Sequence, residues 1–243
     1  MKNYGLIGYP LEHSFSQKIF EEKFRKEQIQ ASYSLFPLPE IKEFPKWISS
    51  QTQLSGLQVT LPHKEKIIPY LNDLDPHAQK IAAVNTLKKT KQGWIGYNTD
   101  YQGFKDSLSD FYPSGKVLIL GTGGAAKAVQ AVFQDMNIPY DLMSRQTSPK
   151  TLSYSLFQTK PKAIQSYAMI INATPLGMHP HPKTTPPLPY QELLGHQKLY
   201  DLVYNPSPSF FLKKGLEKGC PIKDGQEMLL RQAHISWEIW TGK

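Results

Sequence analysis

The sequence predicts an α/β protein built from two domains. Short apolar runs rich in β-forming residues alternate along the chain with longer segments in which apolar residues recur at helical spacing. This alternation is typical of α/β architectures with mostly parallel strands. The length of 243 residues is enough for one to two domains, each with a sizeable core.

The first series of elements occupies residues 1–100. Strands are expected at 4–8, 31–36, 57–60, 84–88 and 94–97, and helices at 16–28, 41–49, 63–71 and 78–82. In the helix at 16–28, Ile19, Phe20 and Phe24 fall on one face, which is the spacing of a buried helical stripe.

The second series follows a similar alternation. Strands are expected at 116–120, 140–144, 168–172 and 199–204, and helices at 124–135, 190–194, 209–218 and 225–240. The segment 174–190 contains six prolines. Because proline removes a backbone donor and restricts the residue before it, we expect this segment to form an irregular surface loop near a site.

Composition and charge exclude several classes of protein. The 28 basic and 20 acidic residues give a net charge of +8, but no segment holds a dense run of Lys and Arg interleaved with aromatics, which argues against nucleic-acid binding. No apolar stretch reaches the roughly 18 residues of a membrane span and no signal-peptide core is present, so a cytoplasmic protein is expected. Cys220 is the only cysteine, and His179 and His181 have no carboxylate nearby in the sequence, so no metal is expected.

A glycine-rich turn follows the strand expected at 116–120. It reads Gly121-Thr-Gly123-Gly124-Ala125-Ala126 and opens the helix expected at 124–135, which is the context of the dinucleotide-binding fingerprint in Rossmann-like domains. Gly121 allows the tight turn, Gly123 lets backbone N–H groups approach a pyrophosphate, and Ala126 permits close packing of helix and strand. A glycine-containing turn without a ligand is the alternative. The residues expected to bind a cofactor here are Gly121, Gly123, Gly124, Ala125 and Ala126.

The end of the next strand indicates which dinucleotide binds. Recognition of NAD requires an acidic side chain there to accept a hydrogen bond from the ribose 2′-hydroxyl, but the chain reads Met143-Ser144-Arg145-Gln146-Thr147. The planar guanidinium of Arg145 can pair with a 2′-phosphate and stack on adenine. NADP is therefore the expected cofactor, with Ser144 and Arg145 as contacts. An ordinary solvated arginine is the alternative, and with only Lys150 as a further cation the preference for NADP is expected to be modest.

Two hydroxyl residues stand at the start of the first expected helix. Ser14 and Ser16 lie near the positive end of the helix dipole, where they can hold an anion such as a carboxylate. Ser14-Phe-Ser-Gln17 is also the sequence of a capping box, in which Ser14 would only satisfy backbone donors. The sequence leaves both interpretations open.

Further polar residues gather where expected strands end. The segments 56–64 and 96–100 each end a strand-like run and open a helical one, so their polar side chains project from the edge of the sheet at which ligands bind in open α/β folds. Taken singly, Asp100 is best interpreted as a helix cap, His63 as a loop histidine and Asn85 as a turn residue. Their combination favours a site.

Taken together, these motifs resemble the shikimate dehydrogenases, a family of NADP-dependent enzymes that interconvert 3-dehydroshikimate and shikimate in aromatic biosynthesis. The resemblance covers the whole chain. The motifs that carry it are His13-Ser-x-Ser16, Val59-Thr-x-Pro-x-Lys64, Ala83-Val-Asn-Thr86, Asn98-Thr-Asp100, the glycine turn, Ile171-Asn-Ala-Thr-Pro-Leu-Gly-Met178, Asp201-Leu-Val-Tyr204-Asn-Pro206, Gly225-Gln-Glu-Met-Leu229 and Gln232-Ala233.

The resemblance implies a role for each matching residue. Lys64 and Asp100 are expected to form the catalytic pair, and a lysine suits this role because the alkoxide that develops during ketone reduction needs a proton and a nearby positive charge. The residues expected to bind the substrate are Ser14, Ser16, Thr60, Lys64, Asn85, Asp100, Tyr204 and Gln232, with the two serines on its carboxylate. Further expected contacts to the cofactor are Asn172, Ala173, Thr174 and Gly225.

The resemblance also implies an architecture. Residues 1–100 with 226–243 are expected to form an α/β substrate-binding catalytic domain, residues 101–225 an NADP-binding Rossmann-like domain, and the site to lie in a cleft between them. The expected partners are shikimate or 3-dehydroshikimate and NADP, without nucleic acid or membrane, in a monomer or homodimer.

Three positions depart from the family's pattern, and two alternative functions stay open. Gln17 stands where proline is usual, Gln58 where asparagine is usual before Val59, and Ser209 where threonine is commoner. The alternatives are a quinate/shikimate dehydrogenase with relaxed use of substrate and NAD, and a non-catalytic NADP-binding regulator. A regulator would be expected to have lost Lys64 or Asp100, and both are present.

Overall fold

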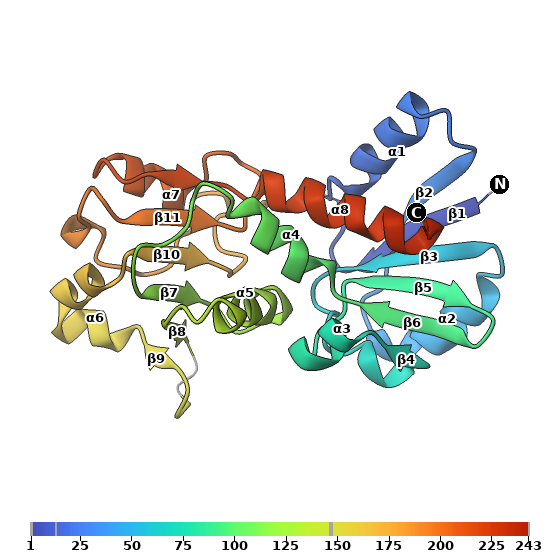
Figure 1. The fold of residues 1–243 in the computed structure, drawn as a ribbon, viewed down its shortest axis with the longest axis horizontal. Coiled ribbons are helices and arrows are strands. Elements are labelled where there is room, and N and C mark those ends of the chain that lie inside the picture. Colours follow the sequence, from blue (N-terminus) through green and yellow to red (C-terminus); the bar gives the residue numbers. More distant parts are fainter. Residues whose placement is uncertain (1, 13, 146–147, 243) are drawn as a thin grey trace. The chain divides into compact units, whose positions relative to one another are not determined.

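The computed structural model describes residues 2–12, 14–145 and 148–242, which divide into two compact units. Unit 1 comprises Met1–Gln102 and Leu230–Lys243, and unit 2 comprises Gly103–Leu229. The chain passes between the units within helix α4 (Thr99–Ser107) and again within helix α8 (Gln226–Thr241), as Figure 1 shows. In its described residues each unit contains a six-stranded sheet.

Unit 1 is built on a mixed sheet in the order β2-β1-β3-β5-β6-β4. Its strands are β1 (Lys2–Gly8), β2 (Ala31–Pro37), β3 (Leu54–Val59), β4 (Asp73–Leu74), β5 (Thr86–Thr90) and β6 (Gly93–Tyr97). β5 is antiparallel to both β3 and β6, with Gln58 opposite Thr86 and Thr86 opposite Tyr97, whereas the other strand pairs in the sheet are parallel. The start of β5 therefore lies at the same edge as the ends of β3 and β6.

Alternate residues of β1 enter two different cores, because successive side chains of a strand point to opposite faces. Tyr4 packs with Phe20 and Phe24 of helix α1 (Ser16–Lys26) and with Trp240 of α8. The buried stripe predicted for this helix is thereby confirmed. Ile7 belongs to the second core, whose aromatic member Phe44 begins helix α2 (Phe44–Ser50). Trp240 also donates from Nε1 to the carbonyl oxygen of Leu87 at 2.9 Å, which fixes α8 on the sheet.

Two short helical segments complete unit 1, and one prediction there is wrong. Helix α3 (Pro76–Ile81) begins two residues before the expected 78–82, capped by Asp75. The helix expected at 63–71 is absent from these residues, all of which are described, and turns lead instead into a single 3₁₀ turn at Ile68–Tyr70. Pro69 explains the difference, because it has no N–H to donate and restricts the residue before it. The helix expected at 41–49 is a 3₁₀ turn at Ile41–Glu43 followed by α2.

Unit 2 is built on a parallel sheet in the order β12-β11-β10-β7-β8-β9. Its strands are β7 (Val117–Leu120), β8 (Tyr140–Ser144), β9 (Leu152–Ser153), β10 (Met169–Asn172), β11 (Lys198–Asp201) and β12 (Ile222–Lys223). Counted from β7 as the first strand, the order reads 3-2-1-4-5-6, which is the order of Rossmann dinucleotide-binding domains. The order reverses between β7 and β10, and that point is where such folds bind their ligands.

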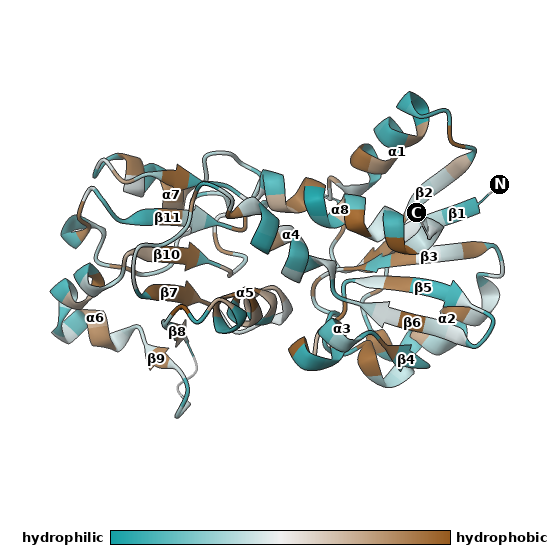
Figure 2. Ribbon diagram, viewed as in Figure 1, coloured by the Kyte–Doolittle hydropathy of each residue, from teal (hydrophilic) through white to brown (hydrophobic). Residues whose placement is uncertain are grey.

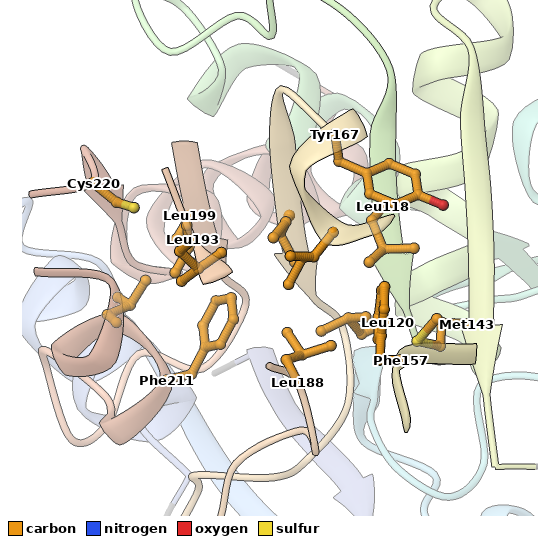
Figure 3. Packing of buried hydrophobic residues seen from close by; sticks show 13 residues of the cluster. Leu118, Leu120, Met143, Phe157, Tyr167, Leu188, Leu193, Leu199, Phe211 and Cys220 are labelled. Atoms are coloured by element: carbon orange, nitrogen blue, oxygen red, sulfur yellow. The ribbon is translucent and has the colours of Figure 1, made fainter. Parts of the chain in front are cut away.

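The helices of unit 2 close over a continuous apolar core. α5 (Gly124–Asp135) has the predicted bounds, α7 (Phe210–Leu216) is shorter than the expected 209–218, and α6 (Ser155–Thr159) was not predicted. Figure 2 shows the most hydrophobic colouring on β7 and β10. Figure 3 shows Leu118 and Leu120 of β7 packed in one cluster with Leu199 of β11 and Phe211 of α7. The central strands are buried because both of their faces are covered.

Some elements of unit 2 were not predicted or were predicted wrongly. The helix expected at 190–194 is a 3₁₀ turn at Tyr190–Glu192, and the strand expected at 199–204 ends at Asp201. β9 and β12 have two residues each, too few to produce an alternating pattern. Residues 174–189, all of which are described, contain no helix or strand, so the irregular proline-rich loop is confirmed.

A buried carboxylate ties the ends of β10 and β11 to α7. Asp201 is fully buried and accepts hydrogen bonds from Asn172 Nδ2 at 2.9 Å, from the backbone N–H of Val203 at 3.0 Å and from the hydroxyl of Ser209. Asn172 in turn accepts from the backbone N–H of Thr174 at 3.1 Å and from its hydroxyl at 2.6 Å. Burial raises the pKa of Asp201 to about 7, because the hydrogen bonds offset only part of the desolvation of its charged form.

Replacing Asp201 with Asn should change how stability depends on pH. The raised pKa means that between about pH 4 and pH 7 the folded chain binds a proton that the unfolded carboxyl group, with its ordinary pKa of 3.8, has released. The contribution of this group to stability is thus complete below about pH 4 and is lost as the pH rises through 7. Since an asparagine stays neutral, urea unfolding should show the Asp201→Asn variant gaining stability relative to the parent as the pH rises from 4 to 8.

Asp110→Asn is the matched control. The exposed carboxyl group of Asp110 has a lowered pKa, through hydrogen bonds from its own backbone and from Ser109 and the charge of Lys223, so its effect has the opposite sign. A stability difference between parent and Asp201→Asn that is constant from pH 4 to 8 would contradict the prediction.

Candidate active site

The predicted lysine and aspartate form an ion pair in unit 1. Lys64 Nζ lies 2.6 Å from Asp100 Oδ2, and the two side chains are only 14% and 6% exposed. Asp100 lies in the first turn of α4, where the helix dipole stabilises a carboxylate. Asn98 supplies the capping contact, accepting from the backbone N–H of Tyr101 at 3.1 Å. Asp100 is thus a paired acid and not the residue that caps this helix.

The backbone positions Lys64 at the shared sheet edge. After β3, the N–H of Thr60 donates to the carbonyl oxygen of Ile7 at 2.9 Å, which holds the loop against the end of β1. The carbonyl oxygen of Lys64 accepts from the N–H of Val84 at 2.7 Å, just before β5. Between them His63 is buried and its Nε2 bonds to the carbonyl oxygen of Leu38, so it anchors the loop.

Asn85 holds Asp100 from the side opposite Lys64. Its Nδ2 donates to Asp100 Oδ1 and to Thr99 Oγ1, each at 2.9 Å, and its Oδ1 accepts from the backbone N–H of Thr99 at 2.7 Å. A carboxylate only accepts and a backbone N–H only donates, so these two partners fix the orientation of the amide. Asn85 is therefore a buried organising residue and not a simple turn residue.

Helix α8 brings Gln232 to this network. Gln232 Oε1 accepts from Gln58 Nε2 at 2.9 Å and lies 3.5 Å from Asn85 Nδ2. Ser236, one turn further on, shares a hydrogen bond of 2.8 Å with Thr86. The structure thus joins Lys64, Asn85, Asp100 and Gln232 directly. Four further members, which sequence reasoning did not include, are Gln58, Thr86, Thr99 and Ser236.

The two predicted anion-binding serines stand at the start of α1. Ser14 Oγ accepts from the backbone N–H of Ser16 at 3.3 Å, in line with a local structural role. The capping box itself is not formed, because no side chain caps α1 and Gln17 donates instead to Glu21 at 2.8 Å. Ser16 is buried. His13 lies outside the described residues, and Thr60 is half-buried at the end of β3.

In unit 2, the two predicted cofactor segments touch. Gly121 has φ +104°, a conformation that favours glycine, and its N–H donates to the carbonyl oxygen of Met143 at 2.8 Å. A Cβ added to Gly121 would lie 3.1 Å from both the carbonyl oxygen of Ala173 and Cγ2 of Thr174. The turn after β7 and the loop after β10 therefore meet where the strand order reverses.

The start of α5 has the form of an anion cradle. Gly123 is its N-cap residue, no side chain caps this end, and the first turn carries no acidic residue. Among the described residues, a Cβ added to Gly123 would meet no protein atom within 4 Å. Gly124 and Ala126 are buried and Ala125 is half-buried, which brings α5 close to β7 as predicted. The backbone N–H groups of this turn can receive a phosphate.

The remaining predicted residues of unit 2 have different surroundings. Ser144 ends β8 half-buried and Arg145 follows it in an exposed position, whereas Gln146 and Thr147 lie outside the described residues. The positive charge of Arg145 lowers the pKa of Tyr154, which burial nevertheless raises to about 12. The buried amide of Asn172 supports the loop through Asp201 and Thr174, so a direct cofactor contact of its side chain stays a prediction.

Tyr204 and Gly225 follow the ends of β11 and β12. Tyr204 is half-buried in unit 2. A Cβ at Gly225 would lie 2.2 Å from the carbonyl oxygen of Leu202, so only glycine fits there. Their roles toward substrate and cofactor stay predictions.

Metal-ligand clusters and membrane spans can be assessed for the described part of the chain. It contains no group of three or more His, Cys, Asp or Glu residues arranged to hold a metal ion. His179 is half-buried and His181 is exposed. In the same ranges, no helix combines the length and the apolar character needed to cross a bilayer.

Comparison with known proteins identifies the family. Residues 6–87 match the family model described as the shikimate dehydrogenase substrate binding domain. The shikimate dehydrogenase (NADP(+)) of Methanococcus maripaludis (strain C6) is 36% identical over an alignment that covers 98% of this chain and 91% of that protein. The corresponding enzyme of Desulforamulus reducens is 32% identical over 98% of this chain and 89% of its own length.

Solved structures agree. The crystal structure of shikimate dehydrogenase 1 from Peptoclostridium difficile matches with a TM-score of 0.89 and 34% identity, covering 100% of this chain and 92% of that one. The enzyme of Thermus thermophilus, solved in complex with NADP(H) and shikimate, matches with a TM-score of 0.87 and 26% identity, covering 100% and 94%. With relatives more than 30% identical over nearly its whole length, the chain belongs to the shikimate dehydrogenase family.

Proposed function

We propose that this protein catalyses the reversible, NADP-dependent reduction of 3-dehydroshikimate to shikimate, in the pathway to chorismate and the aromatic amino acids. The observation that carries the proposal is the buried Lys64–Asp100 pair, 2.6 Å apart and braced by Asn85, in a chain of this family. A cytoplasmic location and a monomeric or homodimeric state remain predictions.

Lys64 is the proton donor in this proposal. NADPH, when bound, supplies the hydride that reduces the ketone. The carbonyl oxygen then gains negative charge, and Lys64 Nζ both stabilises that charge and gives it a proton. Asp100 orients Lys64, because its Oδ2 holds the ammonium group while Asn85 holds its Oδ1. In the oxidation direction the same pair accepts the proton.

The other residues of the proposed site hold the substrate. The hydroxyl groups of Ser14 and Ser16 bind its carboxylate at the start of α1, where the helix dipole favours an anion. Hydroxyl and amide groups suit the ring hydroxyls of shikimate, because they can both donate and accept. In this proposal the residues that hold the ring and its hydroxyls are Thr60, Asn85, Asp100 and Gln232, with Tyr204 near the carboxylate.

Unit 2 supplies a fitting site for NADP. The turn Gly121–Ala126 is interpreted as the pyrophosphate site, because Gly123 leaves room for a ligand at the uncapped start of α5. Arg145, with Ser144, is assigned to the 2′-phosphate. Asn172, Ala173, Thr174 and Gly225 are assigned to the nicotinamide end. On this assignment residues 1–100 with 226–243 form the substrate domain and 101–225 the NADP domain.

Steady-state rates with four substrate pairs test the proposed function. Shikimate and quinate are each assayed with NADP and with NAD. We expect the highest kcat/KM for shikimate with NADP. Comparable rates with quinate or NAD would favour the relaxed quinate/shikimate dehydrogenase, and binding of NADP without turnover of either substrate would favour a non-catalytic regulator.

Removing the ammonium group of Lys64 should abolish most of the catalysis. We expect Lys64→Ala to lower kcat by about 10²–10⁴, with a smaller change in KM, because general acid–base help is lost. Lys66→Ala is the control, since Lys66 is exposed two residues away and its replacement removes the same charge. A Lys64→Ala variant with near-parental kcat would refute the assigned role.

Two variants separate the pyrophosphate site from the 2′-phosphate site. A methyl group at Gly123 would occupy the cradle used by both cofactors, so Gly123→Ala should weaken NADPH and NADH binding alike. Arg145→Ala should weaken NADPH binding, by about tenfold or more, and leave NADH binding nearly unchanged, because only NADPH carries the 2′-phosphate. Calorimetric titration measures both affinities, and equal losses in Arg145→Ala would contradict its assignment.

A further inference from the structure

Gln58 is a buried polar residue to which the mechanism above assigns no role. It lies next to the last residue of β3 and is 2% exposed. Its side chain nevertheless meets three polar partners from two other elements, β2 and α8. A buried amide with this many partners is costly to disturb, so its contacts constrain the groups around it.

The partners of Gln58 determine which way its amide faces. Tyr33, on β2, donates from its hydroxyl to Gln58 Oε1 at 2.6 Å. Gln58 Nε2 consequently faces α8, where it donates to Gln232 Oε1 at 2.9 Å and to Ser236 Oγ at 3.3 Å.

Tyr33 is itself held firmly. Its ring stacks on Phe20 with centroids 4.6 Å apart and planes only 8° from parallel, and its side chain is buried. Burial raises the pKa of its hydroxyl well above 10, so this group stays a proton donor across the physiological range. The direction of the hydrogen bond from Tyr33 to Gln58 is therefore constant with pH.

The hydrogen bond from Gln58 determines the orientation of the Gln232 amide. Its Oε1 faces the donor Nε2 of Gln58 and also lies 3.5 Å from Asn85 Nδ2 and from Thr99 Oγ1. With the oxygen turned toward these groups, Nε2 is the end of the amide directed the other way. A reversal would place two NH₂ groups, those of Gln58 and Gln232, against each other.

We propose that Gln58 is a positioning residue that orients the Gln232 amide so that Gln232 presents its Nε2 donor to a hydroxyl oxygen of the substrate. This inference rests on the proposed function. The length of the glutamine side chain matters here, because one shorter by a carbon–carbon bond, about 1.5 Å, would not reach from Tyr33 to α8 in the same way.

A double-mutant cycle on Gln58 and Gln232 tests the proposal. Shikimate affinity is measured by calorimetry in the presence of NADPH, with which shikimate cannot react, for the parent, Gln58→Leu, Gln232→Leu and the double variant. We expect each single variant to weaken shikimate binding about tenfold or more, and the double variant to bind about as weakly as Gln232→Leu alone. Affinity for NADPH should stay within about twofold in all four. The pH dependence of kcat should be the same in Gln58→Leu as in the parent, because the hydrogen bonds of Gln58 run to Tyr33, Gln232 and Ser236 and not to the Lys64–Asp100 pair.

Two companion variants keep the test decisive. Tyr33→Phe removes the donor that orients Gln58, so it should weaken shikimate binding in the parent but cause no further loss in Gln232→Leu. This variant replaces Gln58→Leu in the test if Gln58→Leu does not fold. Gln53→Leu is the matched control, because Gln53 just precedes β3 at its other end, in an exposed hydrogen bond with Asn3, and should leave shikimate binding unchanged.

Other outcomes overturn the proposal. Additive losses in the double variant would mean that Gln58 acts on the substrate by another route, and parental affinity in Gln58→Leu would mean that it does not act at all. Failure of the parent to turn over shikimate would remove the proposed function, and this inference with it. If the parent turns over shikimate but the losses are additive or Gln58→Leu keeps parental affinity, only this inference is overturned and the proposed function stands.

Discussion

The hydrogen bonds of Asn85 are the interaction on which the candidate site depends. This one amide binds the N–H of Thr99 with its oxygen and the carboxylate of Asp100 with its nitrogen, so it joins the start of β5 to the start of α4. The opposite oxygen of Asp100 then faces Lys64, which comes from the loop after β3. Without Asn85, the buried carboxylate would keep only one strong partner, and burying a charge is costly unless it is well satisfied.

The wider network follows from the same constraint. Gln58, Thr86 and Ser236 meet between β3, β5 and α8, where water is excluded, and polar groups in such a place must find partners in the protein. Each of these hydrogen bonds also restricts the orientation of the two side chains, because donors and acceptors allow few arrangements. The hydrogen bonds from Tyr33 through Gln58 to Gln232 therefore couple β2, β3 and α8, which are distant in the sequence.

In unit 2 the important feature is a helix start whose backbone N–H groups have no side-chain cap. The start of α5 has neither a capping side chain nor an acidic residue, and Gly123 adds no bulk there. Such an end is suited to a phosphate. The glycine turn before α5 meets the loop after β10, and Asp201 ties that loop to the start of α7 through one buried carboxylate. A loop held in this way loses less entropy when a ligand binds.

Local sequence by itself determined the parallel α/β framework of unit 2, the bounds of α5 and β8, the glycine turn and the motifs that led to the family. These features depend on neighbours within about ten residues, through apolar periodicity and the absence of Cβ atoms. The short strands β9 and β12 and the turn at 68–70 were missed, because packing and a single proline outweighed weak local patterns. Only the tertiary structure decided that β5 is antiparallel, which carries Asn85 to the edge where β3 and β6 end. Only it decided that Gln58 meets Gln232, since the partners of a buried polar group depend on contacts 174 residues apart in the chain.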